Sequence, residues 1–419
     1  MTLISNSKTI VRAAAAGALL VIAAGCSLDA VNPGPIQADQ LNNIGALSSL
    51  VNGAGRDLAE ALNYDSYTGA AVARELFPGG STGSFGITVR QQSGKLADDD
   101  GDEWWNLSQR SRWTAEDAVT RAKSVLGAAA ASSSSLAQAL IWAGYSNRLL
   151  GENFCEAVIN GGAKQASTVY LDRAEANFTE AIVVATAASN ATLVQAATAG
   201  RAAVRLDKGN VAGAATDAGA ITNNAFTYKM PYYQTELDQY NRIYWAGANQ
   251  PYRAHTVWNT VNEAYRKALR DPRVPFDSSP TVLVGDAAVG SLGRVRWYFQ
   301  TKYNDRTAGI NLSSGWEMRL IEAEVKLVGG DVAGAMALIN ARRIALTLPP
   351  LTAAAAPDAW AALKRERGIE LWLEARRLGD LRRWATLNRP GALDPKEELA
   401  GRDLCFATSL SEKQTNKNY

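Results

Sequence analysis

The sequence predicts a mostly α-helical fold, and three observations support that prediction. Alanine-rich segments with apolar residues at helical spacing are the dominant pattern in the chain. Segments with the two-residue alternation of a β-strand are few, and one helix–turn–helix pattern occurs twice. Apolar residues make up 47% of the 419 residues and charged residues 20%, a balance typical of a globular protein and not of a disordered one.

The predicted helices are assigned from apolar residues at helical spacing and from start and stop signals. They cover residues 37–62, 104–130, 135–154, 168–188, 191–208, 211–222, 256–269, 315–328, 332–346 and 358–378. The best strand signals are at residues 87–89 and 295–299, where β-branched and aromatic residues gather. We expect these strands to form one or two small β-hairpins.

An internal repeat indicates how the helices are paired. The sequence LDKGNVAGAATDA, from Leu206, returns as LVGGDVAGAMALI, from Leu327. In each copy a helix ends at a glycine, and an Asn or Asp that can cap the next helix follows at once. Helix pairs of this kind are the unit of tetratricopeptide-like scaffolds. The predicted fold is therefore a tetratricopeptide-like helix-pair scaffold with long loops and one or two small β-hairpins.

The N-terminus has the pattern of a bacterial lipoprotein. Lys8 and Arg12 precede the apolar run AAAAGALLVIAA, which is about the length of a secretory h-region and ends at Ala-Gly-Cys. We predict that residues 1–25 are a signal peptide, that Cys26 carries the lipid anchor, and that residues 26–37 are a tether. The folded domain would then span residues 38–419.

Charge and the residue after the anchor indicate where the mature protein is found. The chain has 43 Lys and Arg against 41 Asp and Glu, and removal of the signal peptide takes away two basic residues. The mature protein is then neutral, which argues against a nucleic-acid partner held by charge. Ser27 stands where an aspartate would signal retention in the inner membrane. The sequence therefore predicts a lipid-anchored protein of the cell outer membrane.

Two cysteines remain after the anchor, Cys155 and Cys405. An exported protein meets an oxidising compartment, so this pair is a candidate disulfide. The alternative is two separate buried thiols, and sequence spacing does not decide between them.

Three carboxylates recur at one-turn spacing near the C-terminus, at Glu366, Glu370 and Glu374. Like charges at this spacing repel one another. Arg367 and Arg377 lie one turn away, so each carboxylate can pair with a guanidinium. We interpret the cluster as a partly buried structural ion network. The alternative is that Glu366 and Glu370 are the acid–base pair of a glycoside hydrolase.

The same segment resembles the C-terminal signature of the SusD/RagB family. KRERGIELWLEARRLGDLRRW is similar to the family run E-R-x-x-E-L-x-x-E-x-x-R-x-x-D-L-x-R-W. The matching positions are Glu366, Arg367, Glu370, Leu371, Glu374, Arg377, Asp380, Leu381, Arg383 and Trp384. DEWWNLSQRSRWTAEDAV is similar to the family's early helix, and ALRDPRVPF to its Asp-Pro-Arg turn. The resemblance implies the tetratricopeptide-like scaffold that the repeat also predicts, with loops inserted at about residues 223–312.

The resemblance also implies a function. Family members are surface-exposed nutrient-capture proteins that pass a ligand to a SusC-like TonB-dependent outer-membrane transporter. The ligand would be an oligosaccharide, with a peptide as the less favoured choice, and the chain would be no enzyme and hold no cofactor or metal. An acidic run at residues 98–103 is predicted to be a solvated loop rather than a calcium site, because Glu103 stands at the sixth loop position, where an EF-hand loop has glycine. Two alternatives remain: the glycoside hydrolase, and a tetratricopeptide-like scaffold that binds protein.

Aromatic residues indicate where a ligand would bind. The chain has 11 Trp and 14 Tyr against 8 Phe, so amphipathic rings outnumber the purely apolar one. A flat ring offers its apolar face to the C–H groups of a sugar. The resemblance places the ligand surface in residues 90–106 and 232–303. The predicted ligand-binding residues are Trp104, Trp105, Asn106, Asp102, Arg90, Tyr244, Trp245 and Trp297. For each ring the alternative is ordinary packing.

Overall fold

The computed structural model describes residues 40–80, 86–97, 99–248 and 252–419. The predicted signal peptide, the Cys26 anchor and the tether lie outside the described residues. Residues from Asn42 to Tyr419 form one structural unit, and the following paragraphs concern that unit.

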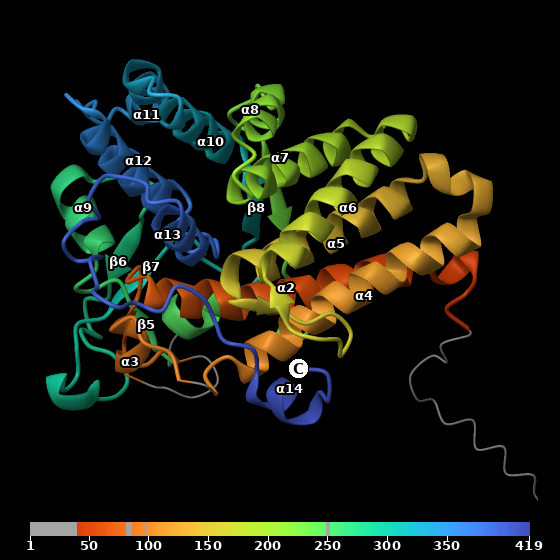
Figure 1. Cartoon of the computed structure of the whole chain (residues 1–419). Helices are drawn as coiled ribbons and strands as arrows, with labels where there is room; N and C mark the ends of the chain where they lie inside the picture. Colours follow the sequence, from red (N-terminus) through yellow and green to blue (C-terminus); the bar gives the residue numbers. More distant parts are fainter. Residues whose placement is uncertain (1–39, 81–85, 98, 249–251) are drawn as a thin grey trace, which may run out of the picture. The chain divides into compact units, whose positions relative to one another are not determined.

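The fold is mostly α-helical, as predicted (Figure 1). The main helices are α2 (Leu47–Val72), α4 (Asp102–Leu126), α5 (Ser134–Asn153), α6 (Thr168–Ala187), α7 (Ala191–Asp207), α8 (Val211–Ala220), α9 (Val261–Leu269), α10 (Gly315–Val328), α11 (Val332–Ala345), α12 (Ala356–Glu370) and α13 (Arg377–Thr386). Shorter elements are η1 (Ile44–Ala46), α3 (Val89–Gln92), η2 (Gly127–Ser132), η3 (Leu237–Gln239), the π-helix η4 (Tyr244–Ala248), η5 (Gly290–Leu292) and α14 (Leu410–Thr415).

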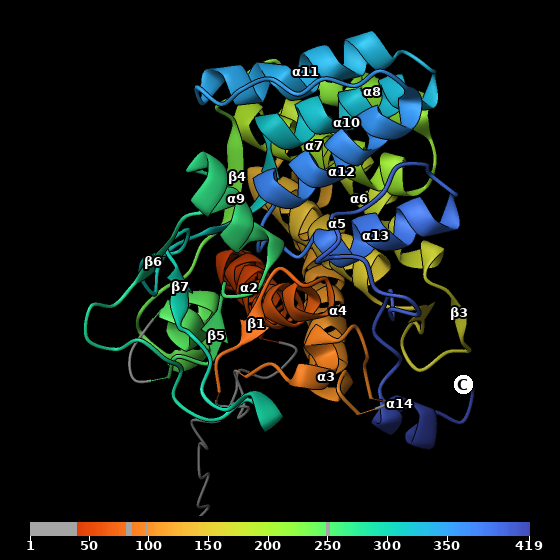
Figure 2. The same ribbon diagram turned by 90° about the vertical axis from the view of Figure 1, so that its left-hand side faces the viewer.

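Successive helices pack against one another as a stack. Helix α2 packs on α4 and α5, and from α4 to α8 each helix packs on the next. Helix α10 continues the stack on α8 and carries α11 and α12 (Figure 2). In the described part of the chain, no single helix is long and apolar enough to cross a membrane. The segments Asp102–Ser132 and Ser134–Asn153 pass that test only as a pair bent by 113°.

The internal repeat is confirmed as two matching helix pairs, α7–α8 and α10–α11. Gly209 and Gly330 end the first helix of each pair with φ of 76° and 80°, a left-handed conformation that favours glycine. The Asn210 side chain then accepts a hydrogen bond from Gly213 N at 3.0 Å. Asp331 caps the second copy in the same way.

The strands form antiparallel ladders of two, more numerous than the one or two hairpins expected. The pairs are β1 (Phe77–Pro78) with β5 (His255–Thr256), β2 (Glu156–Ala157) with β3 (Gln165–Ala166), β4 (Thr227–Met230) with β8 (Ile310–Ser314), and β6 (Phe276–Ser278) with β7 (Tyr298–Gln300). The prediction of a strand at residues 87–89 was wrong, because Thr88 instead caps helix α3 in a capping box. The strand predicted at 295–299 begins only at Tyr298.

The first helix begins and ends ten residues later than predicted, at Leu47–Val72 instead of 37–62. Its last turns contain Asn63, Asp65, Ser66 and Thr68, polar residues that interrupt the apolar pattern. All four are buried at 0–1% exposure, because α4 and α5 pack on this part of α2. Tertiary packing therefore keeps helical a segment that local propensity does not mark as such.

The predicted helix 358–378 is two helices, and this is a second correction. Helix α12 ends at Glu370, and α13 begins at Arg377. Between them Leu373 and Ala375 adopt φ of 60° and 57°, which non-glycine residues adopt only when the surroundings hold them there. Glu374 consequently leaves the helix face that it was expected to share with Glu370.

Cys155 and Cys405 form a disulfide, with their Cα atoms 5.1 Å apart. The bond holds the C-terminal segment against the end of α5, where Cys155 N also donates to Phe406 O at 2.9 Å. The predicted pairing is thus present in the structure, and the two-thiol alternative is not.

Candidate functional site

The C-terminal carboxylates form a buried ion network rather than an open catalytic pair. Glu366 is 1% exposed and accepts Arg343 Nη1 at 2.6 Å and Arg273 Nη1 at 2.7 Å. Glu370 pairs with Arg342 at 3.0 Å. A glycosidase needs its two carboxyl groups on either side of a bound sugar. Here arginines enclose both groups, so the geometry argues against the hydrolase alternative.

The partners within this network differ from those expected. Arg367 donates to both oxygens of Asp380 at 2.8 Å, and Arg377 pairs with Glu397 at 2.7 Å. Burial alone would raise the pKa of Asp380, but the positive charges of Arg367 and Arg383 outweigh burial and lower that pKa to about 2. The prediction of a structural network is supported, whereas the predicted one-turn pairings were wrong because the helix breaks after Glu370.

Two of the predicted ligand-binding rings are core residues. Trp105 is 1% exposed and packs edge-on against Phe154 with ring centroids 5.4 Å apart. Trp297 is 2% exposed, and its Nε1 donates to the carbonyl oxygen of Gly247 at 3.0 Å. Neither ring presents a face to a ligand in this structure, so their role is support.

The other predicted residues at the start of α4 contact the chain's own C-terminal segment or stand apart. Trp104 is half-buried and stacks on Phe406, with centroids 6.2 Å apart. Asp102 accepts a hydrogen bond from Leu410 N at 2.6 Å. Arg90 is exposed and pairs with Asp100 at 2.9 Å, and Asn106 is exposed on α4. In this half of the predicted site, Trp104 and Asp102 therefore bind the C-terminal segment of the chain itself.

The second half of the predicted site contains a group of partly exposed rings around Trp245. Trp245 lies between Tyr240, at 5.3 Å between ring centroids, and Tyr252, at 5.1 Å. The Arg306 guanidinium lies 4.8 Å from the centre of Tyr240 and 4.6 Å from the centre of Trp245. Tyr252 is 36% exposed, and the other three side chains are half-buried. We call Tyr240, Trp245, Tyr252 and Arg306 the aromatic cluster.

Backbone contacts from three elements position the aromatic cluster. Asn63 of α2 donates to Tyr240 O at 2.8 Å and accepts from Arg242 N at 2.9 Å. Asn241 is 0% exposed, caps the π-helix η4 through Tyr244 N at 3.0 Å, and donates to Ala308 O at 2.7 Å. The carbonyl of Gly247 is held by the buried Trp297. Tyr244, also predicted, is half-buried and packs against the core instead of joining the aromatic cluster.

The aromatic cluster can bind a molecule that has both an apolar face and hydroxyl groups. The rings supply flat apolar surface, and Arg306 and the tyrosine hydroxyls supply hydrogen-bonding groups beside it. Within the described residues there is no group of three or more His, Cys, Asp or Glu arranged to hold a metal ion. Tyr240 and Tyr252 lie within the predicted range 232–303 but were not among the predicted ligand-binding residues, and Arg306, which no motif marks, lies outside that range.

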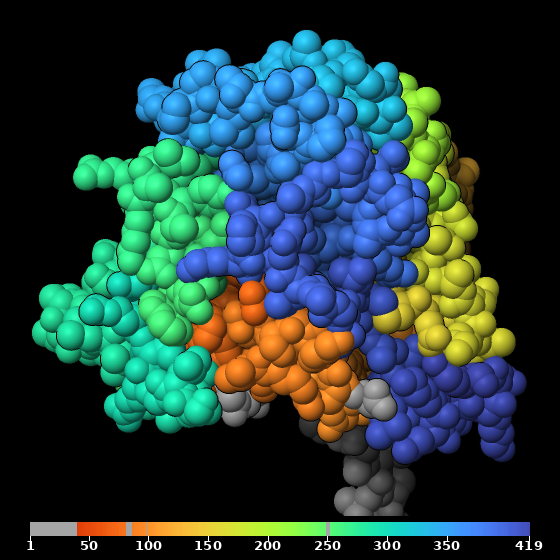
Figure 3. Space-filling model, turned by 60° about the vertical axis from the view of Figure 1, so that its left-hand side comes forward, coloured from red at the N-terminus to blue at the C-terminus, as the bar shows by residue number. Residues whose placement is uncertain are grey.

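The cluster lies in the long segment between α8 and α10. In Figure 3 the green and teal residues of this segment stand to one side of the blue C-terminal helices. Fold and site together define a class: a stacked helix-pair protein that carries a partly exposed aromatic cluster on inserted loops. Such loops vary in sequence more freely than the scaffold, which makes them suited to recognition.

Comparison with known proteins shows which family and which solved structures the chain resembles. Residues 286–419 match the model of the SusD family. Three solved structures share the fold: a SusD-like carbohydrate binding protein from Bacteroides vulgatus (TM-score 0.65, 15% identity, 90% of this chain and 97% of that one), a SusD superfamily protein from Parabacteroides distasonis (0.65, 12%, 92% and 98%), and a laminarin binding SusD-like protein (0.58, 15%, 90% and 98%). A comparison with curated proteins gave no match. The chain is thus similar to the SusD family in the sequence of its C-terminal part and to SusD-like proteins in its fold.

Proposed function

We propose that the chain captures a neutral oligosaccharide on the aromatic cluster and passes it, chemically unchanged, to a SusC-like TonB-dependent transporter. The observation that carries this proposal is the array of Tyr240, Trp245 and Tyr252 around Arg306. Rings of this kind stack on sugars and leave the hydroxyls to nearby donors and acceptors. The laminarin binding relative and the SusD-like carbohydrate binding relative support the choice of a glycan over a peptide.

The proposal includes a place in the cell. The sequence of residues 1–26 supports export and lipid attachment at Cys26, with the binding domain on the outer face of the outer membrane. Cys26→Ser removes the site of lipid attachment and should therefore abolish fatty-acid labelling. The protein should also leave the membrane fraction, because stable anchoring needs more than one acyl chain. Unchanged labelling of the variant would contradict the anchor.

A glycan array tests the binding function directly. Residues 28–419, which start after the anchor, should bind one group of neutral oligosaccharides, and Trp245→Ala should bind the same group more weakly. Chromatography of the bound glycan after prolonged incubation should show no shortened products. A blank glycan array together with binding on a peptide array would replace the glycan with a peptide, and cleavage products would restore the hydrolase alternative.

The transporter partner requires its own experiment. Full-length protein should co-purify with a TonB-dependent transporter from detergent-solubilised outer membranes, and Trp245→Ala should co-purify equally well. Absence of any such transporter, with the aromatic cluster still binding glycan, would limit the function to capture.

A further inference from the structure

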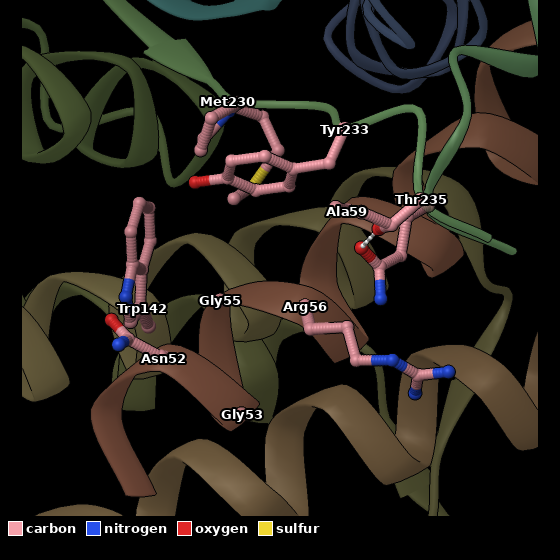
Figure 4. Close-up of a pocket in the computed structure, with 11 residues that line it drawn as sticks. Asn52, Gly53, Gly55, Arg56, Ala59, Trp142, Met230, Tyr233 and Thr235 are labelled. Atoms are coloured by element: carbon pink, nitrogen blue, oxygen red, sulfur yellow. Dashed lines mark hydrogen bonds between the residues drawn. The ribbon is translucent and has the colours of Figure 1, made fainter. Parts of the chain in front are cut away.

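A second cavity lies beside the aromatic cluster, on the N-terminal half of α2. Its volume is about 470 Å³. Trp142 of α5 and Tyr233 form two of its walls, and Gly53 and Gly55 of α2 form the floor (Figure 4). We call this cavity the α2 slot. Its size is within the range of small-ligand sites in proteins.

The two rings that wall the α2 slot differ in exposure, since Trp142 is 8% exposed and Tyr233 is much more open. Tyr233 is 57% exposed, lies over Met230, and is held by a hydrogen bond from its backbone N to Gln239 O at 2.9 Å. The indole N–H of Trp142 donates to no residue that the structure describes. A Cβ at Gly55 would come within 3.1 Å of this indole nitrogen, so glycine lets the ring lie against the helix.

The polar groups of the α2 slot are suited to hydroxyl groups. Thr235 donates its hydroxyl to Gln239 Oε1 at 2.8 Å. The amide N–H groups of Gln239 then have no acceptor among the described side chains and backbone. Asn52, an exposed amide, stands at the edge near Trp142. Donors and acceptors of this kind, next to two rings, are what a sugar residue requires.

The charges around the α2 slot favour a neutral occupant. Arg56, the cationic residue in its lining, pairs with Asp238 and with Asp57, the latter at 3.3 Å. Arg110 pairs in turn with Asp57 at 3.3 Å and with Glu60 at 2.5 Å. The three carboxylates outnumber the two guanidinium groups, so no uncompensated positive charge is available to attract an anionic glycan.

The α2 slot and the aromatic cluster are neighbours along α2. Gln239 lines the slot, and the next residue, Tyr240, is the first ring of the cluster. Ala59 lines the slot, and Asn63, one turn further along α2, holds the backbone of Tyr240. A chain of sugars that leaves the cluster in this direction therefore meets the slot.

From this continuity we infer that the α2 slot holds a further unit of the same glycan that occupies the aromatic cluster. The inference rests on the proposed function and narrows its ligand to an extended, neutral oligosaccharide longer than a disaccharide. One ring contact in a binding site is worth about a tenfold change in affinity or more. Occupation of the slot should therefore appear as a dependence of affinity on glycan length.

The test is an array of neutral and uronic-acid-containing oligosaccharides, each printed from the disaccharide upwards. Wild-type protein should bind the longer neutral glycans about tenfold more tightly than the disaccharides, and lengthening a uronate glycan should bring no such gain. Gly53→Phe fills the slot and should remove the length dependence, with disaccharide binding unchanged. Gly53→Ala is the matched control: a Cβ at this position meets no atom within 4 Å, so the slot stays open and binding should be unaffected.

The possible failures are distinguishable. Wild-type binding that is equal for disaccharide and longer glycan, or a Gly53→Phe variant that keeps the length dependence, would overturn the slot while the proposed function stands. Binding to no glycan at all would overturn the proposed function itself, and the slot with it. If Gly53→Phe does not fold, Tyr233→Ala decides the question, because it removes an exposed ring and should abolish the length dependence alone.

Discussion

The stacked helices and the inserted loops use the same residue types in opposite ways. In the stack, Arg383 lies among Glu324, Asp380 and Asp207; the first three of these groups are buried and Asp207 is partly buried. In the loops, Arg306 lies on the faces of two half-exposed rings. Charged groups in the stack stabilise the contacts between helices. In the loops, rings and an arginine remain accessible to a ligand. Stability and binding should therefore respond to different substitutions.

The largest expected effect on stability is at Glu366. Glu366→Ala leaves Arg343 and Arg273 facing each other without the carboxylate that neutralises them, in a site that is 1% exposed. Breaking a buried pair of this kind is expected to lower the free energy of unfolding by about 3–5 kcal/mol. Chemical denaturation should show this loss, and Glu398→Ala, which removes an exposed carboxylate, should show almost none. Equal stability of the two variants would mean that the network is not structural.

Reduction of the Cys155–Cys405 disulfide should have the next largest effect. The bond joins residues separated by 250 positions in the sequence, and loss of such a link is expected to destabilise the protein by about 2–4 kcal/mol. Intact mass after alkylation, with and without reduction, establishes whether the bond is present. Thermal melting with and without reductant then measures its contribution. Two alkylated thiols in unreduced protein would contradict the structure.

Much of the stack was predictable because its signals are local. A helix cap, a terminating glycine and regular apolar spacing can each be recognised from a few consecutive residues, as at Asn210 and Asp331. The break between α12 and α13 was not predictable, since Leu373 and Ala375 give no local sign of a positive φ. The C-terminal signature therefore predicted the match of residues 286–419 to the SusD family model. It did not predict that Arg343 and Arg273 pair with Glu366.

The site was harder to predict because exposure is a property of the fold. Trp104 and Trp105 are adjacent and chemically identical, yet one is half-buried and the other is 1% exposed. Both the buried Trp297 and the partly exposed aromatic cluster around Trp245 come from segments rich in aromatic residues. What distinguishes the proposed binding residues from the supporting Trp297 is a contact between distant parts of the chain. Arg306 contacts Trp245 and Tyr240, which lie 61 and 66 positions earlier in the sequence.

The pH dependence of stability provides a third measurement on the stack. The pKa of Asp380 is about 2 in the folded protein, below its ordinary value of 3.8. A carboxyl with a lowered pKa contributes stability that is present above the unfolded value and is lost as the pH falls toward the folded value. The contribution is on the order of 2 kcal/mol. Denaturation midpoints between pH 4 and pH 2 should fall more steeply for wild type than for Asp380→Asn, and parallel curves would contradict the assignment.

The smallest expected effect on stability is at Trp245, and there the comparison between loops and stack is sharpest. Trp245→Ala removes a half-buried ring of the aromatic cluster, so the melting temperature should stay close to that of wild type. Its binding to the glycan found on the array should weaken by about 1–3 kcal/mol, the contribution of one aromatic contact.

Trp105→Ala is the matched control in the stack. The Trp105 ring is 1% exposed and packs against Phe154, so its loss should lower the free energy of unfolding by about 3–5 kcal/mol. Calorimetry and thermal melting of both variants separate the two roles. If Trp245→Ala binds as wild type does, or melts as early as Trp105→Ala, the ring is a packing residue and the ligand site lies elsewhere.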